Sequence, residues 1–500
     1  MRPAGTIGGA GRLDRVREFA DNLLAHARPE GSPLFMDRLD GDARCRDFSR
    51  LSGAGGEFAL SNLADQQCLM RMLVGLTGLT GDDRYRTAAL DSVRFVLQQF
   101  ADPAGLLAWG GHVAITLPMR DVAVETAKRP RHELKCVYPF YELMWQADAM
   151  ATRKCIEAFW NAHVSDWQRL DFSRHGRYQV KIGALWESEY DPGPVFFWGQ
   201  GLTFSRTGSD LYYAAAMHTH LSGAPKPLVW AKRLARRYVE TRQPGVGISG
   251  YQYSQCADSE CNGREIRGDR AQYQYAPYLP EGHLIYESTI FRPYPAVQRS
   301  QMHLAETLRG LGDEFSDWAS EELAAWARVA YRARDNVFLP MLTDGYSLEG
   351  FVIRKDGYFG PRGRVEEGRF AGADFFWAYA QAYRLTKDEI FWAMARSIAR
   401  ANGLGDIGEQ PGAGVSLEPA SEVCDHRFVH GLLEVFKATG DPSYLRCAEA
   451  IADAIIARGF REGWFLAEHG RSANRPEALA ILRLVAVESG REQDVPAAIV

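Results

Sequence analysis

The sequence predicts an all-α dominated protein, an α/α toroid built as an incomplete barrel of about seven helical hairpins. Three observations favour this fold class. Amphipathic helices follow one recurring turn pattern, long loops rich in glycine and aromatic residues separate the hairpins, and the 500 residues have ordinary globular composition, with 46% hydrophobic and 24% charged side chains. Small β elements are expected where the long loops meet at the mouth of the ring.

The hairpin repeat is visible in LTGDDRYRTAALDSV, LTKDEIFWAMARSIA and ATGDPSYLRCAEAIA. Each copy places a threonine, then an aromatic residue and then an alanine at the same offsets: Thr80, Tyr85 and Ala89; Thr386, Phe391 and Ala395; Thr439, Tyr444 and Ala448. In a fourth copy, LSGAPKPLVWAKRLA, Ser222 and Ala231 keep the spacing, with proline at the aromatic position. The polar turn caps the second helix and the small alanine lets two helices approach closely.

The domain organisation predicted from this repeat is a single catalytic domain spanning residues 1–500. The segment from Gly245 to Gly282 is dense in glycine and tyrosine and is too long for a simple connector. We therefore expect residues 245–295 to form a long loop inserted at the active site, because binding groups commonly lie on loops held by a rigid scaffold. Residues after Glu492 are expected to form a loose tail.

Charge and hydropathy exclude several classes of partner. A net charge of −5 gives no general attraction to nucleic acid or anionic membranes, and the sequence has no apolar run of membrane-spanning length. The first residues, MRPAGTIGGAGRLDRVREFADNL, lack a signal-peptide core, so we expect a cytoplasmic protein. The eight scattered cysteines predict mainly reduced, buried thiols. Cys256 and Cys261 could hold a metal, form a loop disulfide or lie near each other by chance.

Candidate chemistry gathers in three segments. DFSRHGRYQV places Arg174 beside His175 after a helix, WGGH contains His112, and RHELK contains His132 and Glu133. Imidazoles and a carboxylate of this kind hold Mn, Ca or a similar divalent ion with positions left for substrate oxygens. Taken singly, each residue has an ordinary alternative role: a turn residue, an acid at a helix N-terminus or a surface cation. His163, in FWNAHVSDW, is typical of a packed core histidine.

These motifs, together with YPFYELMW and GDRAQYQYAP, resemble the family 2 pectate lyases. That family consists of α/α-toroid enzymes that cleave polygalacturonate by β-elimination. The resemblance is densest from about Trp109 to Gly176 and around Arg270. It implies a divalent metal ion, Mn or Ca, held by His112, Glu133 and His175. It also implies an arginine as Brønsted base, which we place at Arg174, and an oligogalacturonide or related uronate as substrate.

The chemistry requires neutralisation of the uronate carboxylate before the neighbouring C5 proton can be removed. Arginine is an unusual base because its pKa is roughly 12 or above. A cationic neighbour such as His175 would favour its neutral form. Since a guanidinium fork suits a carboxylate, Arg270 and Arg292 are candidate substrate clamps, and Lys135, Arg177 and Trp109 are further substrate-binding candidates. Each of the four cations could equally be a solvated surface charge.

Other activities on the same scaffold remain open at this point, because fold does not settle function. A glycoside hydrolase would use paired carboxylates, for which Asp344, Glu349 and Asp374 are available. A sugar epimerase would use two histidines, such as His426 and His430. A protein that only binds oligosaccharides would keep the aromatic loops without a working base.

Overall fold

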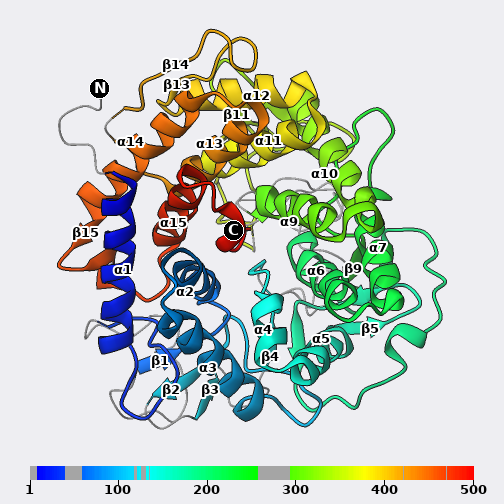
Figure 1. The fold of residues 1–500 in the computed structure, drawn as a ribbon. Coiled ribbons are helices and arrows are strands. Elements are labelled where there is room, and N and C mark those ends of the chain that lie inside the picture. The colour runs from blue at the N-terminus through cyan, green and yellow to red at the C-terminus, as the bar shows by residue number, and fades with distance from the viewer. Residues whose placement is uncertain are drawn as a thin grey trace.

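The architecture is a ring of helices that alternate between an inner and an outer layer (Figure 1). A computed structural model describes residues 8–39, 59–117, 121–124, 131–134, 136–256, 293–357, 359–420, 422–468 and 470–499. The inner layer comprises α2 (Gln67–Thr80), α4 (Tyr141–Ala147), α6 (Ser205–Ser222), α9 (Pro293–Leu308), α11 (Ala373–Thr386), α13 (His426–Thr439) and α15 (Pro476–Glu488). The outer layer comprises α1 (Gly9–His26), α3 (Asp83–Gln99), α5 (Ala149–His163), α7 (Pro225–Val239), α10 (Asp313–Ala325), α12 (Glu389–Ala401) and α14 (Pro442–Gly459). The predicted α/α toroid is confirmed.

The turns that join inner to outer helices share one construction. A threonine ends the inner helix, its hydroxyl accepts the amide of an aspartate two residues later, and this aspartate caps the outer helix: Thr80 with Asp82, Thr386 with Asp388, and Thr439 with Asp441. The residue between them is left-handed, with φ of 74° at Gly81, 75° at Gly440 and 60° at Lys387. The repeated aromatic and alanine positions are all buried, as the helical repeat predicts.

The small β elements lie on the longer connections that lead back to the inner helices. Three-stranded antiparallel sheets are formed by β1 (Ala59–Ser61), β2 (Val113–Leu117) and β3 (Val122–Val124), by β10 (Tyr331–Arg332), β11 (Val337–Phe338) and β12 (Arg369–Phe370), and by β15 (Phe460–Arg461), β16 (Trp464–Ala467) and β17 (Gly470–Arg471). Two-stranded pairs are β4 (Arg131–Glu133) with β7 (His175–Arg177), β5 (Val164–Asp166) with β6 (Asp171–Phe172), β8 (Phe197–Gly199) with β9 (Ser254–Cys256), and β13 (Gly405–Asp406) with β14 (Ser416–Leu417). These strands carry the candidate site.

The core lies between the two helical layers as one large cluster of buried apolar side chains. Cysteines 68, 136, 155 and 447 are buried free thiols and Cys424 is a partly buried one, in line with the prediction of reduced cysteines. The Cys261 side of the C-x4-C pair lies outside the described residues. Within the described ranges, none of the helices is both long and apolar enough to cross a bilayer.

The residues that follow Glu492 do not form the loose tail expected from the sequence. Val495 and Ile499 are each only 3% exposed. Arg483 donates to the carbonyls of Val495 and Pro496, and Arg299 Nε donates to the carbonyl of Ile499 over 3.2 Å. This segment enters the centre of the ring (Figure 1), where two buried arginines hold it in place. The sequence offered no helical period here, so the interaction with distant arginines could not be foreseen.

The two ends of the chain meet where α15 packs against α1 and α2. Arg12 of α1 is fully buried at this junction. Its Nε lies 2.8 Å from Asp453 of α14, its Nη1 lies 2.8 Å from Glu488 of α15, and Glu449 lies 3.8 Å away. One guanidinium therefore joins three helices that close the ring.

We expect Arg12→Met to lower the free energy of unfolding by roughly 3 kcal/mol, because removing one partner of a buried ion pair leaves the others uncompensated. Arg15→Met is the matched control, since Arg15 is exposed on the same helix, where it pairs with Glu18 at 3.0 Å and lies 5.4 Å from the Phe460 ring. Its cost should stay below about 1 kcal/mol. Urea unfolding measures the stability of both variants. Equal unfolding midpoints for the two would contradict the stabilising role of the Arg12 ion pairs.

Candidate functional site

The candidate site is built on the antiparallel pair β4–β7. Glu133 lies directly opposite His175, and His132 lies opposite Gly176. Side chains alternate between the two faces of a strand, so Glu133, His175 and Arg177 share one face and His132 and Gly176 share the other. Backbone pairing thus brings a carboxylate and an imidazole that are far apart in sequence onto the same surface.

His112 is added from the loop that precedes β2. The amide of Glu133 donates to the carbonyl of Trp109 over 3.2 Å, so this loop lies against β4. Gly110 has φ of 92°, and a Cβ at this position would come within 2.1 Å of the Glu133 carbonyl oxygen. Only glycine permits so close an approach. The first glycine of WGGH therefore has a structural reason, which is to bring the loop that carries His112 against β4.

The three side chains converge on one point. The Nε2 atoms of His112 and His175 lie 3.1 Å apart, and they lie 3.5 and 3.6 Å from the nearest Glu133 oxygens. One donor atom from each residue lies within 4.8 Å of the other two. Two nitrogens bound to one ion at about 2.1 Å, at a right angle, would be about 3.0 Å apart. The donor set and its spacing fit a divalent cation, as predicted from the sequence, although metal binding itself stays a prediction.

The electrostatics of the cluster suit a neutral imidazole at His175. Burial lowers the pKa of His175, and the positive charge of Arg174 acts in the same direction, whereas contact with Glu133 opposes the shift. A metal-binding histidine must be neutral. Two imidazole nitrogens at 3.1 Å also repel each other through their lone pairs unless a proton or a cation lies between them.

Arg174 lies at the edge of the cluster. Its side chain is 26% exposed, and its Nε lies 3.9 Å from a Glu133 oxygen. Its carbonyl accepts the amide of Leu134 over 3.3 Å, which continues the β4–β7 pairing. The guanidinium is therefore next to the proposed ligands and still accessible from solvent.

The remaining predicted substrate residues fall into three groups. Arg177 is exposed and lies two residues beyond His175 on the same face of β7. Trp109 is fully buried against Phe159, with ring centroids 6.0 Å apart, which argues against the direct substrate contact predicted for it. Lys135, Arg270 and Arg292, with most of the loop 245–295, lie outside the described residues.

Sequence reasoning did not assign a role to His132, which lies one residue from a proposed ligand. His132 is fully buried and His163 is 2% exposed, so His163 is the core histidine that the sequence predicted. Their rings are in contact, with His132 Nδ1 2.7 Å from His163 Nε2. The sequence carries no readable signal for this placement, because β4 has only three residues; once Glu133 is known to lie on a strand, its neighbour must face the opposite side.

The buried His163 predicts a pH-dependent stability. Burial lowers its pKa to about 4, below the ordinary value of 6.5. The unfolded chain therefore binds this proton more readily, so the stabilisation is complete above pH 6.5 and is lost as the pH falls toward 4. Between pH 7 and pH 5 in the presence of chelator, we expect the wild-type protein to lose up to about 2 kcal/mol more unfolding free energy than His163→Gln does. Urea unfolding at both pH values measures the difference, and equal losses would contradict it.

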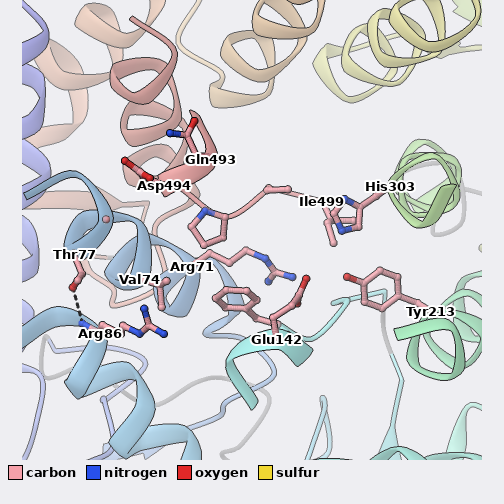
Figure 2. Close-up of a pocket in the computed structure, with 14 residues that line it drawn as sticks. Arg71, Val74, Thr77, Arg86, Glu142, Tyr213, His303, Gln493, Asp494 and Ile499 are labelled. Atoms are coloured by element: carbon pink, nitrogen blue, oxygen red, sulfur yellow. Dashed lines mark hydrogen bonds between the residues drawn. The ribbon is translucent and has the colours of Figure 1, made fainter. Parts of the chain in front are cut away.

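Two cavities near the middle of the ring contain none of the residues assigned to the candidate site. The first has a volume of about 390 Å³, and Figure 2 shows Arg71, Glu142, Tyr213 and His303 facing it, with Ile499 at one side. The second, of about 260 Å³, is lined in part by Trp377 and His430.

The residues of the alternative activities are also placed. His430 stacks on Trp377, and the rings of His426 and His430 are 6.3 Å apart. Asp344 and Glu349 are exposed, and Glu349 pairs with Arg332 at 2.8 Å. Asp374 is in the first turn of α11 and lies 3.6 Å from Arg427. Glu349 and Asp374 thus each lie beside an arginine. None of the three carboxylates belongs to the β4–β7 cluster.

Comparison with known proteins gives one family match. The family model described as periplasmic pectate lyase matches residues 32–500. A pectate disaccharide-lyase from Dickeya dadantii (strain 3937) is 29% identical over 464 residues, covering 89% of this chain and 82% of that protein.

Solved structures also resemble the chain at low sequence identity. A cellobiose 2-epimerase from Bacillus thermoamylovorans B4167 is 9% identical with a TM-score of 0.44, covering 95% of this chain and 99% of that one. A D-mannose isomerase is 13% identical with a TM-score of 0.46, covering 88% and 99%. An unsaturated glucuronyl hydrolase specific for heparin is 11% identical with a TM-score of 0.44, covering 97% and 99%. At these values the likeness carries no information about activity.

The predicted cytoplasmic location is wrong, because the matched family is described as periplasmic. That prediction depended on the composition of the first residues. A leader is a targeting signal that takes no part in the folded domain, so those residues do not report the compartment in which the fold works.

Proposed function

The chain belongs to the family described as periplasmic pectate lyase, and we propose that it cleaves pectate or oligogalacturonides by metal-assisted β-elimination at the His112–Glu133–His175 cluster. The observation that supports this proposal most is the convergence of three ligand-type side chains from separate segments, with donor atoms within 4.8 Å of one another. Arg174 beside them supplies a candidate base. We further propose that residues 1–500 act as one catalytic domain.

The reaction removes the C5 proton of a uronate and expels the oxygen at C4. The C5–H and C4–O bonds break and a C4–C5 double bond forms. The leaving oxygen takes up a proton from the solvent and ends as a hydroxyl, the base returns the C5 proton to the solvent, and no water is consumed. A divalent cation in the cluster would supply Lewis-acid stabilisation of the charge that develops on the uronate carboxylate. His112 and His175 would hold it as neutral nitrogen donors and Glu133 as the anionic donor.

Arg174 would accept the C5 proton on its guanidine. Its Nε lies 3.9 Å from a Glu133 oxygen, so the base would stand directly beside the proposed ligands. A divalent cation held there would place positive charge close to Arg174, and such a charge would favour the neutral guanidine over the guanidinium.

Substrate binding would use the exposed edge of β7. Arg177 lies two residues beyond His175 on the same face of β7. Its guanidinium could hold the carboxylate of the uronate unit next to the unit that reacts. Arg270 and Arg292, within the proposed loop 245–295, and Lys135 remain candidate clamps for substrate carboxylates. Trp109 would support the site through its packing against Phe159 and would not contact the substrate itself.

The test is an elimination assay on oligogalacturonides with the chelated protein and with added Mn²⁺ or Ca²⁺. We expect ultraviolet absorption from the new double bond, its loss on chelation and its recovery with the ion. A hydrolase would consume such double bonds, and an epimerase would change neither absorption nor chain length. Elimination that persists undiminished in chelator would refute the metal dependence, and the absence of any absorbing product would refute the reaction class.

A further inference from the structure

A pair of buried histidines lies behind the β4–β7 pair, on the face opposite the proposed ligands. His163 is the last residue of α5, and it contacts both strands. Its Nδ1 lies 2.8 Å from the carbonyl oxygen of Ser173, just before β7, and its Nε2 lies 2.7 Å from Nδ1 of His132 on β4. The amide of Ser173 also donates to the His163 carbonyl over 3.0 Å.

The Ser173 carbonyl sets the protonation of both rings. A carbonyl oxygen can only accept, so His163 must carry its proton on Nδ1 and present a lone pair at Nε2. His132 must then donate from Nδ1. Burial holds both rings neutral, with the pKa of His132 well below its usual value. These two hydrogen bonds connect the segment just before β7 to β4 through one residue of α5, His163.

The fit around His163 is also tight. A Cβ at Gly176 would lie 2.7 Å from His163 Nε2, so the imidazole lies directly against the β7 backbone. The ring of His132 packs on Phe159, one helical turn before His163, with centroids 4.4 Å apart. A three-residue pair of strands has few backbone hydrogen bonds of its own, so these contacts matter for its register.

We propose that His163 is a positioning residue that fixes the pairing of β4 with β7 and so holds Glu133 and His175 at ligand spacing. The inference rests on the proposed metal site for its functional consequence. Its structural part is independent, because His163 touches no ligand and acts through the backbone of Gly176 and through His132. A slip of one residue between the strands would turn either Glu133 or His175 to the buried face.

The test compares His163→Phe with His218→Phe. Phenylalanine keeps a ring but loses both hydrogen bonds. His218 is a matched control, because it is 1% exposed on α6, lies 2.9 Å from Ser222 Oγ and also reaches α5 through Glu157 at 3.8 Å, and neither partner is on β4 or β7. In the metal-free proteins we expect amide exchange in peptides spanning β4 and β7 to rise about tenfold in His163→Phe and to be unchanged in His218→Phe. Calorimetric titration with Mn²⁺ should show an affinity about tenfold weaker only in His163→Phe.

A third variant, His163→Asn, keeps a donor near the Nδ1 position and should recover part of the exchange protection. Unchanged exchange in His163→Phe, at a melting temperature lowered as much as in His218→Phe, would overturn the positioning role. If the wild-type protein binds no Mn²⁺ while β4–β7 exchange still rises in His163→Phe, the metal site fails and the positioning role stands. If the wild-type protein and His163→Phe bind Mn²⁺ equally, the inference fails and the metal site stands.

Discussion

Replacing Arg174 by alanine is expected to lower kcat for elimination by about 10³-fold while leaving KM within a few-fold, because a general base contributes roughly 10²–10⁴ to the rate. The side chain is 26% exposed and makes one long contact with Glu133, so its loss should cost little stability. An arginine that only clamps the substrate would instead raise KM with kcat preserved.

Two further variants sharpen this experiment. Arg169→Ala removes an exposed arginine whose guanidinium lies 5.6 Å from the Phe197 ring, and we expect near-native activity from it. Arg174→Lys keeps a cation but moves and reshapes the basic group, so we expect an intermediate rate. Near-native kcat in Arg174→Ala would remove Arg174 from the base role.

The second large effect is expected at Glu133. Glu133→Gln keeps the size of the side chain and removes its charge, so the cluster loses its single anionic donor. We expect Mn²⁺ affinity to weaken by at least about 100-fold and elimination at low metal concentration to disappear. Part of the rate should return at saturating Mn²⁺, since both imidazoles remain.

Calorimetric Mn²⁺ titration measures this effect, and Glu322→Gln provides the control. Glu322 of α10 is also buried, but it binds Ser249 and Arg242, and neither of these belongs to the cluster. Its variant should lose stability and keep Mn²⁺ affinity. Equal affinities in the wild-type protein and Glu133→Gln would show that Glu133 is not a ligand.

The hairpins could be predicted from sequence because their determinants are local. In LTGDDRY the threonine, the left-handed glycine and the capping aspartate lie within a few residues, and Tyr85 and Ala89 mark the buried face of the next helix. The same local signals recur at Thr386 and Thr439. They fix where each hairpin turns and which side faces its neighbour.

The site was less accessible to sequence reasoning because its geometry depends on pairing across long separations. The residue types of His112, Glu133 and His175 indicated metal chemistry, but strands of three residues show no readable alternation. Only the β4–β7 register reveals that Glu133 faces His175 and that His132 faces inward. Trp109 illustrates the same limit, since it was a substrate-binding candidate from the sequence and tertiary packing buries it.

The most direct test of the account is a crystal structure of the Mn²⁺-loaded protein with anomalous diffraction data. The account predicts a single strong anomalous peak between His112 Nε2, His175 Nε2 and the Glu133 carboxylate, at about 2.0–2.3 Å from each donor. A peak coordinated by other side chains in an active, Mn²⁺-dependent enzyme, with these three left uncoordinated, would contradict it.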